Sequence, residues 1–469
     1  MNPRTGVRDY RPLIAVSAPI AGIQLAQVAL TTTDLTMMGL MSVEAIAAGG
    51  LAITLYNQLR TMCVGMVTAV GNLVASSAAR GEDDRRSPGE RLGGKAEEEV
   101  RQVVRSAFLV ATAMAVLGAG ILIGLGYAMV WFGQSAHTLE LARPAIVTLA
   151  PGLIPMLWLN VLRQFAVGMR RPGSLLWVTL ASIAVNAALD GAFIYGWMGM
   201  PRLGLAGIGL ATTLVQFVNF FAFAMIVRRD RQLRHLLSLR GWKADIRTVR
   251  EIVRLGVPIC LTYGSEAGIT SVATVLMGTF GPAMLAAHNI VNQLAYIAYQ
   301  FNIGISQGSS ILISRAASKN DPAAARTIAG RAMRLSAVLM ALFAVFYLVA
   351  PSWALWLFLD HHDTPQIQAA AHTLLYLAIA HQFFKGAQNV NVGLLRGLGN
   401  TKSGFHITLI GYWAIGVPAM LLAGYALDLG GPGIWIGLCL GFGATAVLLL
   451  RRFHRDLPTA TTPSVLSAA

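Results

Sequence analysis

The stretch LIAVSAPIAGIQLAQVALTTTDLTMMGLM, residues 13–41, decides the fold class of this protein. It is longer than the roughly 20 apolar residues that a helix needs to cross a bilayer, and Asp34 is its only charged residue. The whole chain of 469 residues is similar, with 55% hydrophobic and 12% charged residues, against about 25% charged residues in soluble domains. The sequence therefore predicts an all-α polytopic membrane protein.

Further apolar runs follow the first one, separated by short charged or Gly-rich gaps. The first run is too long for a signal peptide and contains Asp34, so we expect it to be an uncleaved span. The predicted transmembrane helices are twelve: 12–41, 46–78, 106–133, 144–169, 174–199, 205–227, 255–281, 284–314, 335–359, 367–396, 405–427 and 432–450. An even number of spans leaves both termini on the same side.

The Lys and Arg residues predict which side that is, because cytoplasmic loops are enriched in both. Of the 36 Lys and Arg residues, only Arg143 and Arg202 lie in outside segments when the N-terminus is inside. Arg60, Arg163 and Lys385 lie within spans, and the rest lie inside. We therefore expect a multi-pass protein of the cytoplasmic (inner) membrane with both termini cytoplasmic. Since this bias also explains the net charge of +15, no nucleic-acid partner is expected.

The chain repeats itself, and a basic connector separates the two copies. A shift of 239 residues places Pro19 on Pro258 and Gly65 on Gly304 without a gap. Six spans per copy is an even number, so the two lobes are expected to be parallel and pseudo-symmetric. The predicted organisation is an N-lobe (1–227), a cytoplasmic connector (228–254), a C-lobe (255–455) and a cytoplasmic tail (456–469).

Three acids lie deep within predicted spans: Asp34, Asp190 and Glu266. A carboxylate at that depth costs several kcal/mol unless it is compensated. Asn186 and Asp190 are four residues apart and share one helix face. If Asp34 faces them, the oxygens form a site for Na⁺ or for a shared proton. Structural hydrogen bonding is the alternative for a single buried Asp.

Three further residues have both a structural and a functional interpretation. Thr212 lies at a depth where its hydroxyl could join the acids, or it could bond its own i−4 carbonyl. Pro19 kinks the first span, either as a fixed bend or as a hinge that moves with the charge of Asp34. The only Lys within a span, Lys385, is expected to pair with Glu266. That pair either pins two helices together or opens when a ligand arrives.

No motif for an enzyme or a bound cofactor stands out. The chain lacks the P-loop pattern GxxxxGK[ST], which argues against ATP as the energy source. The histidines within spans are scattered without zinc spacing, and the three cysteines lie in apolar runs as packing residues. The expected cofactor is therefore none, apart from a coupling ion, H⁺ or Na⁺.

Several motifs resemble the multidrug and toxic compound extrusion (MATE) family, of the bacterial NorM-like type. They are TTTDLTMMG at 31–39, LRQFAVGMRRP at 162–172, SEAGITSVATVLMGTFGPAMLAAHNI at 265–290 and GLLRGLGNTK at 393–402. The resemblance implies two six-helix lobes and export of amphipathic, often cationic compounds by antiport against Na⁺ or H⁺. It assigns the N-lobe cation site to Asp34, Asn186, Asp190 and Thr212, and a C-lobe carboxylate to Glu266. The family often has an Asp where this chain has Lys385, which implies that the N-lobe alone binds the coupling ion.

We therefore expect a secondary active antiporter that works by alternating access and exports small organic compounds. It is expected to be a monomer in the lipid bilayer and not an enzyme. One alternative is a lipid-linked precursor flippase of the same superfamily, which would need a basic cleft for a diphosphate. The other is a membrane-embedded enzyme that uses the paired acids, but the sequence offers no third catalytic partner.

Overall fold

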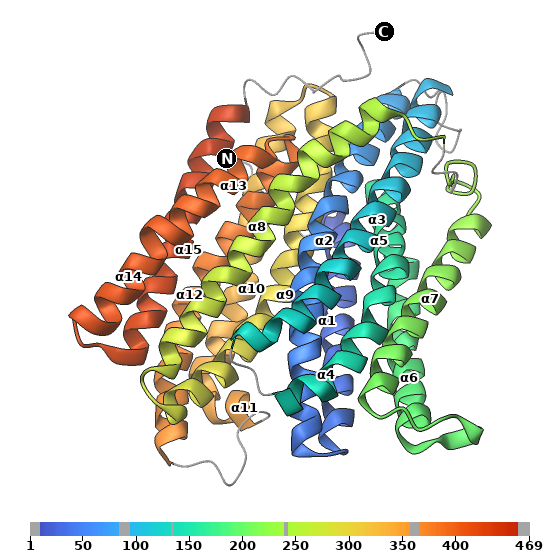
Figure 1. Ribbon diagram of the computed structural model, residues 1–469. Helices are drawn as coiled ribbons and strands as arrows, with labels where there is room; N and C mark the ends of the chain where they lie inside the picture. Colours follow the sequence, from blue (N-terminus) through green and yellow to red (C-terminus); the bar gives the residue numbers. More distant parts are fainter. Residues whose placement is uncertain (1–9, 84–93, 133–135, 239–242, 357–364, 458–469) are drawn as a thin grey trace. The chain divides into compact units, whose positions relative to one another are not determined.

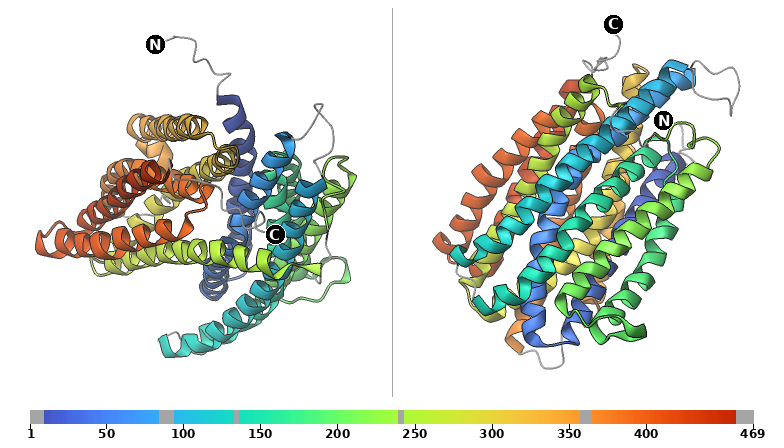
Figure 2. Two further views of the ribbon diagram at one scale, coloured as in Figure 1. Left: turned by 90° about the horizontal axis from the view of Figure 1, so that it is seen from above. Right: turned by 45° about the vertical axis from the view of Figure 1, so that its right-hand side comes forward.

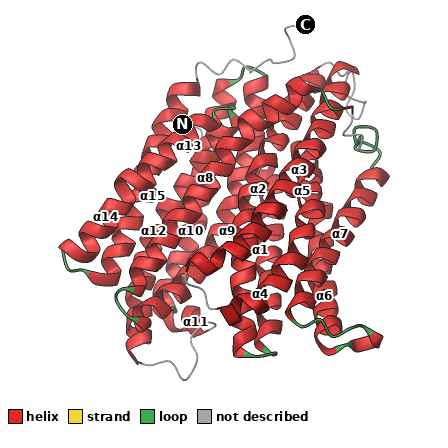
Figure 3. Ribbon diagram, viewed as in Figure 1, coloured by secondary structure: helices red, strands yellow, loops and turns green. Residues whose placement is uncertain are grey.

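The computed structural model of the protein describes residues 10–83, 94–132, 136–238, 243–356 and 365–457. Within these ranges every regular element is helical, and Figure 3 shows helices joined by loops, with no strand. The residues form two compact units. We call Gly22–Cys260 the N-unit, and residues 10–21 with 261–457 the C-unit. The predicted all-α polytopic class is confirmed.

The N-unit is built from long helices whose labels appear in Figure 1: α2 (Val43–Asp83), α3 (Gly94–Ala128), α4 (Ala136–Leu149), α5 (Leu153–Gly168), α6 (Gly173–Tyr195) and α7 (Leu205–Arg229). Helices α4 and α5 make one span, broken by a 3-10 turn at Ala150–Gly152 because Pro151 has no amide hydrogen to donate. At this break the Thr213 hydroxyl of α7 donates to the carbonyl of Thr148 at 2.7 Å. Helix α7 is therefore fixed beside the break.

The C-unit contains α9 (Pro282–Ser318), α10 (Pro322–Val349), α11 (Pro351–Trp356), α12 (Pro365–Gly397), α13 (Thr401–Leu409), α14 (Val417–Leu421) and α15 (Gly430–Asp456). Two π-helical stretches, Ile410–Gly416 and Leu422–Ala426, extend the helical run of α13 and α14. In the described residues, ten helical segments are long and apolar enough to cross a membrane. Helices α9 and α12 have the length, with 37 and 33 residues, but are more polar. Together these segments correspond to the twelve predicted spans.

Two helices, α1 (Arg11–Gly39) and α8 (Ile246–Gly278), belong partly to each unit. The division falls after Ala21 in α1 and after Cys260 in α8, which are 239 residues apart. This separation equals the repeat shift found in the sequence. Each unit therefore contains the first part of one of these two helices and the remainder of the other. The sequence predicted a different division, with the two lobes separated at the connector, residues 228–254.

Glycines make this exchange sterically feasible. A Cβ atom at Gly65 of α2 would lie 2.7 Å from the Cα of Cys260 in α8. A Cβ atom at Gly304 of α9 would lie 2.7 Å from the carbonyl oxygen of Ser17 in α1. Both distances are too short for any side chain, so each glycine allows two helix backbones to approach closely. Gly65 and Gly304 are themselves 239 residues apart.

Charged helix ends extend beyond the apolar runs. Helix α3 begins at Gly94, twelve residues before the predicted span, and α8 begins at Ile246, so the last part of the predicted connector is helical. Helices α6 and α7 run alongside one another within the N-unit, as the views in Figure 2 also show. Most of the predicted tail, residues 458–469, lies outside the described residues.

Candidate functional site

The two acids of the predicted N-lobe site contact the same amide group. Asp34 lies on α1, and Asn186 and Asp190 lie one turn apart on α6. The amide nitrogen of Asn186 donates to Asp34 Oδ1 at 2.5 Å and to Asp190 Oδ2 at 3.0 Å. Asp34 is 7% exposed and Asp190 is 0% exposed. A single amide thus bridges two buried carboxyl groups from different helices.

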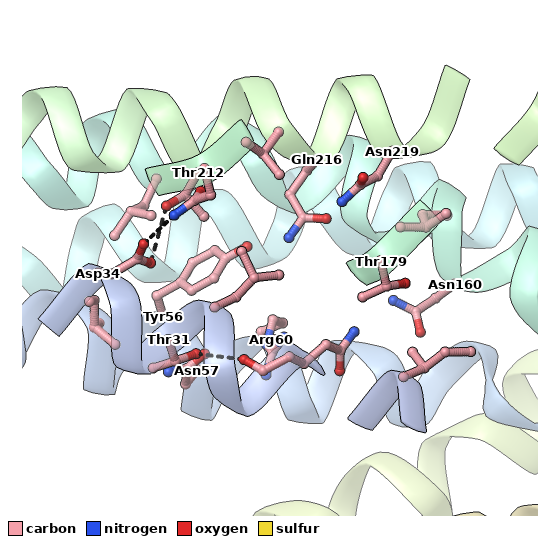
Figure 4. Close-up of a pocket in the computed structure, with 18 of the residues that line it drawn as sticks. Thr31, Asp34, Tyr56, Asn57, Arg60, Asn160, Thr179, Thr212, Gln216 and Asn219 are labelled. Atoms are coloured by element: carbon pink, nitrogen blue, oxygen red, sulfur yellow. Dashed lines mark hydrogen bonds between the residues drawn. The ribbon is translucent and has the colours of Figure 1, made fainter. Parts of the chain in front are cut away.

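Thr212 of α7 lies on the other side of Asp34. Its hydroxyl is 3.4 Å from Asp34 Oδ2 and 3.1 Å from the carbonyl oxygen of Ile208, one turn earlier. Figure 4 shows Asp34 beside Thr212, with dashed lines for the hydrogen bonds. Since a hydroxyl has only one hydrogen, the two acceptors compete for it. Thr212 completes the set of oxygen-bearing groups but is the weakest contact in it.

This arrangement has unused oxygen atoms. Asn186 Oδ1 and Asp190 Oδ1 are buried and have no hydrogen-bond partner among the described residues. Carboxylate, amide and hydroxyl oxygens are the ligands that hard cations prefer. Within the part of the chain that the structure describes, no group of three or more His, Cys, Asp or Glu side chains could hold a metal ion. The oxygen atoms around Asp34 are thus of the kind that binds a hard cation or a proton.

The site opens onto a cavity of the N-unit. Asp34, Asn186 and Thr212 line it, together with residues of α1, α2, α4, α5, α6 and α7. Its other polar lining side chains are Gln27, Thr31, Tyr56, Asn57, Arg60, Asn160, Arg163, Thr179, Gln216 and Asn219. In Figure 4, Asp34 and Thr212 lie at one end, and Asn160, Thr179 and Asn219 at the other. The acid pair therefore adjoins a cavity with a mostly polar wall.

The predicted charge pair of the second lobe lies within the C-unit. Lys385 Nζ of α12 is 3.5 Å from Glu266 Oε1 of α8. The ammonium group also lies 4.4 Å from the ring centre of Tyr299 and 5.4 Å from that of Phe442. Both charged side chains are nearly buried, at 11% and 12% exposure. The ammonium group is therefore held by one carboxylate and two aromatic faces.

Comparison with known proteins identifies the family. The MatE family model matches residues 87–191 and 258–422. A probable multidrug resistance protein NorM of Pseudomonas aeruginosa is 36% identical over 97% of this chain and 91% of its own length. A second one, of Bradyrhizobium diazoefficiens, is 33% identical over 95% and 93% of the two chains. The chain belongs to the MATE family.

Solved structures agree on the MATE fold. The outward-facing conformation of a multidrug resistance MATE transporter of the MOP superfamily superposes with a TM-score of 0.84, covering 98% of this chain and 99% of that one at 16% identity. A crystal structure of a eukaryotic MATE transporter gives 0.83, covering 97% and 98%, also at 16% identity. As a MATE protein, the chain is a multi-pass multidrug efflux transporter and not an enzyme.

The hinge candidate of this MATE chain lies close to the division between its units. Pro19 is inside α1, two residues before the division after Ala21, and Pro258 stands at the equivalent place in α8. An internal proline removes one helix hydrogen bond. The internal proline of each helix therefore lies close to the point where the helix passes from one unit to the other. Movement at Pro19 stays a prediction.

Sequence reasoning missed most of the cavity lining. Asn57 and Arg60 are three residues apart on α2, Asn160 and Arg163 three apart on α5, and Gln216 follows Thr212 by four on α7. Such spacings place both members of a pair on one helix face. A search for polar pairs at helical spacing within apolar spans would have found these walls, whereas a search limited to acids did not.

Proposed function

We propose that this MATE transporter is an antiporter that exports small organic compounds in exchange for H⁺ or Na⁺. The bridge that Asn186 makes between Asp34 and Asp190 supports the proposal most strongly. Two carboxyl groups held by one amide in a buried place need a positive charge, either a proton or a metal cation. Since Asp34 also lines the cavity, binding of the ion changes the charge that a bound substrate meets.

Competition between the ion and the substrate for the part of the cavity wall around Asp34 would couple the entry of one to the release of the other. A ligand shifts a conformational equilibrium only by its difference in affinity for the two states. In our proposal the ion and the substrate each bind next to Asp34 but not together, so that ion entry favours substrate release outward. The charge state of Asp34 would then be transmitted along α1 to Pro19, where the helix changes its bend.

Transport in proteoliposomes tests this proposal. A pH gradient and a Na⁺ gradient are imposed separately, and the flux of a fluorescent substrate is measured. We expect one gradient to drive the flux and thereby to identify the ion. Asp34→Asn and Asp190→Asn should abolish gradient-driven flux, while Glu140→Gln, an exposed acid near the end of a span, should leave it unchanged. Wild-type coupled flux in Asp34→Asn would refute the coupling role.

We also propose a location, a topology and an oligomeric state for the protein. The bias of Lys and Arg supports an inner-membrane position with both termini cytoplasmic. We also propose that the protein works as a monomer, because the cation site and the cavity are both built within one N-unit. Light scattering of the protein in detergent, corrected for bound detergent, should give the mass of one chain. A stable dimer would contradict this.

The flippase alternative is favoured by one observation, the two arginines in the cavity wall. A diphosphate would match guanidinium groups. However, the same cavity contains Asp34, which repels a multiply charged anion when it is ionised. Translocation of a polyprenyl diphosphate by purified protein, without any gradient-driven export of dyes, would favour the flippase over the antiporter.

A further inference from the structure

The segment that follows α7, residues 230–238, packs against the N-unit, although it begins the connector between the two repeats. Leu233 and Leu236 are buried and belong to the hydrophobic core of that unit. At the start of the segment, Arg171 Nη1 from the turn between α5 and α6 donates a hydrogen bond to Asp230 Oδ2 at 2.7 Å. The end of α7 is therefore joined to the neighbouring turn.

Two arginines of α3 hold the later part of this segment. Arg101 Nε donates to the carbonyl oxygen of His235 at 2.7 Å, and Arg105 Nε donates to Ser238 Oγ at 2.8 Å. Buried leucines and side-chain hydrogen bonds thus fix residues 230–238 on the unit at several points. A partner that binds to a surface held in this way loses less free energy to ordering than one that binds to a free linker.

The end of α7 and the segment after it carry a basic patch, which we define as Arg228, Arg229, Arg231 and Arg234. All four side chains are exposed, and none makes an ion pair with a residue that the structure describes. Asp230 is the one acid within this run of sequence, and Arg171 already pairs with it. The positive charge of the patch is therefore uncompensated by the protein itself.

The basic patch continues an apolar stripe on α7. Leu214, Val218, Phe221 and Met225 are all exposed, and spacings of four, three and four residues place them on one helix face. Arg228 follows Met225 by three residues and therefore extends the same face. Acyl chains cover such a stripe in a bilayer, and an arginine at its end reaches the level of the lipid headgroups.

A tryptophan on the neighbouring helix indicates the same level. Trp177 lies in the second turn of α6, six residues after Arg171, and is 73% exposed. Tryptophan is enriched where the hydrocarbon of a bilayer meets water. Because Arg171 pairs with Asp230 at the end of α7, this end of α6 and the basic patch both lie at the membrane interface.

We propose that the basic patch binds the phosphate of an anionic phospholipid, whose acyl chains lie along the exposed stripe of α7. Guanidinium groups bind phosphate oxygens through two parallel hydrogen bonds. A headgroup with a net negative charge is preferred to a zwitterionic one, because choline would bring a further positive charge to four arginines. The proposed lipid site is separate from the cation site and the cavity, so it does not depend on the antiport proposal.

Native mass spectrometry of the full-length protein in detergent tests the proposal. The protein is titrated with dioleoyl phosphatidylglycerol or with dioleoyl phosphatidylcholine, which share their acyl chains and differ in the charge of the headgroup. We expect the first molecule of phosphatidylglycerol to bind about tenfold or more tightly than the first of phosphatidylcholine, because several arginines act together. Equal affinity for the two lipids would overturn the proposal.

Variants then assign the preference to the basic patch. Arg228→Gln/Arg229→Gln should lower the affinity for phosphatidylglycerol about tenfold and leave that for phosphatidylcholine unchanged, whereas Arg228→Lys/Arg229→Lys should retain most of the preference. Arg326→Gln/Arg334→Gln is the matched control, since it removes the same charge from exposed positions on α10. An equal loss of preference in both glutamine pairs would reduce the effect to net charge and contradict the site.

A further measurement separates lipid binding from loss of the fold. All of these variants should unfold at the wild-type temperature in detergent without lipid, because the substituted side chains are exposed. Added phosphatidylglycerol should then raise the thermal midpoint of the wild type and of the α10 control more than that of Arg228→Gln/Arg229→Gln. Displacement of the lipid by a short RNA that binds more tightly would instead assign the patch to a nucleic acid and refute the proposal.

Discussion

At the scale of single residues, the amide of Asn186 contributes more to the cation site than the hydroxyl of Thr212 does. Asn186 donates to both acids at 2.5 and 3.0 Å, whereas the Thr212 hydroxyl lies nearer to Ile208 O than to Asp34. We predict that Asn186→Leu abolishes gradient-driven transport in proteoliposomes and destabilises the protein by about 1–3 kcal/mol. Thr212→Val should retain at least about a third of the wild-type rate. The reverse order of the two effects would contradict this ranking.

The pair of Lys385 and Glu266 allows a test of its structural and functional interpretations. Removing one member of a buried ion pair leaves the other charge uncompensated and costs about 3–5 kcal/mol. Lys385→Met should therefore lower the thermal midpoint in detergent, and the double variant Glu266→Gln/Lys385→Met should recover most of the loss. Lys402→Met, which removes an exposed lysine, is the control. If the double variant is stable and transports normally, the pair pins α8 to α12. If it is stable but inactive, the pair acts in transport.

At the scale of helices, close crossings at two equivalent glycines join α2 to α8 and α9 to α1. Side chains at Gly65 or Gly304 would meet backbone atoms within 3 Å. We predict that Gly65→Val and Gly304→Val each destabilise the protein by about 2 kcal/mol or more, since overpacking forces backbone shifts. Gly120→Val on α3 is the matched control, because nothing lies within 4 Å of a Cβ atom there. Thermal unfolding in detergent measures all three, and equal midpoints for them would refute the crossing argument.

The ends of the helices were the least predictable feature of the fold, because charged residues at these ends were assigned to loops. Helix α10 begins at Pro322, although Arg326, Arg331 and Arg334 delayed the predicted start to residue 335. A local signal was present: Asp321 accepts a hydrogen bond from the backbone N–H of Ala324, and Pro322 follows it at the first helical position. The length of an apolar run indicates how much of a helix lies within the bilayer. The capping residues determine where the helix begins.

At the scale of the whole molecule, the spacing of the repeat was predictable and the exchange between units was not. The shift of 239 residues is visible in the sequence because Pro19, Pro258, Gly65 and Gly304 fit it without a gap. That α1 and α8 pass between units depends on contacts far apart in the chain, such as Gly304 with Ser17. The acid pair was predictable because charge is costly in a bilayer. The polar cavity beside it was missed, because its walls consist mainly of amides, hydroxyls and two arginines, whereas the search followed the acids.

The orientation of the molecule in the membrane is a prediction from charge alone, and it has a direct test. In a background without Cys63, Cys260 and Cys439, single cysteines are introduced as Gln232→Cys and Ser352→Cys, both at exposed positions. Because Lys and Arg favour the cytoplasmic side, a membrane-impermeant maleimide should label Ser352→Cys in intact cells and Gln232→Cys only in inside-out vesicles. Labelling of Gln232→Cys in intact cells would reverse the topology. Because an exporter that exchanges its substrate for an ion needs inward ion flow in either orientation, this test of the topology is independent of the antiport proposal.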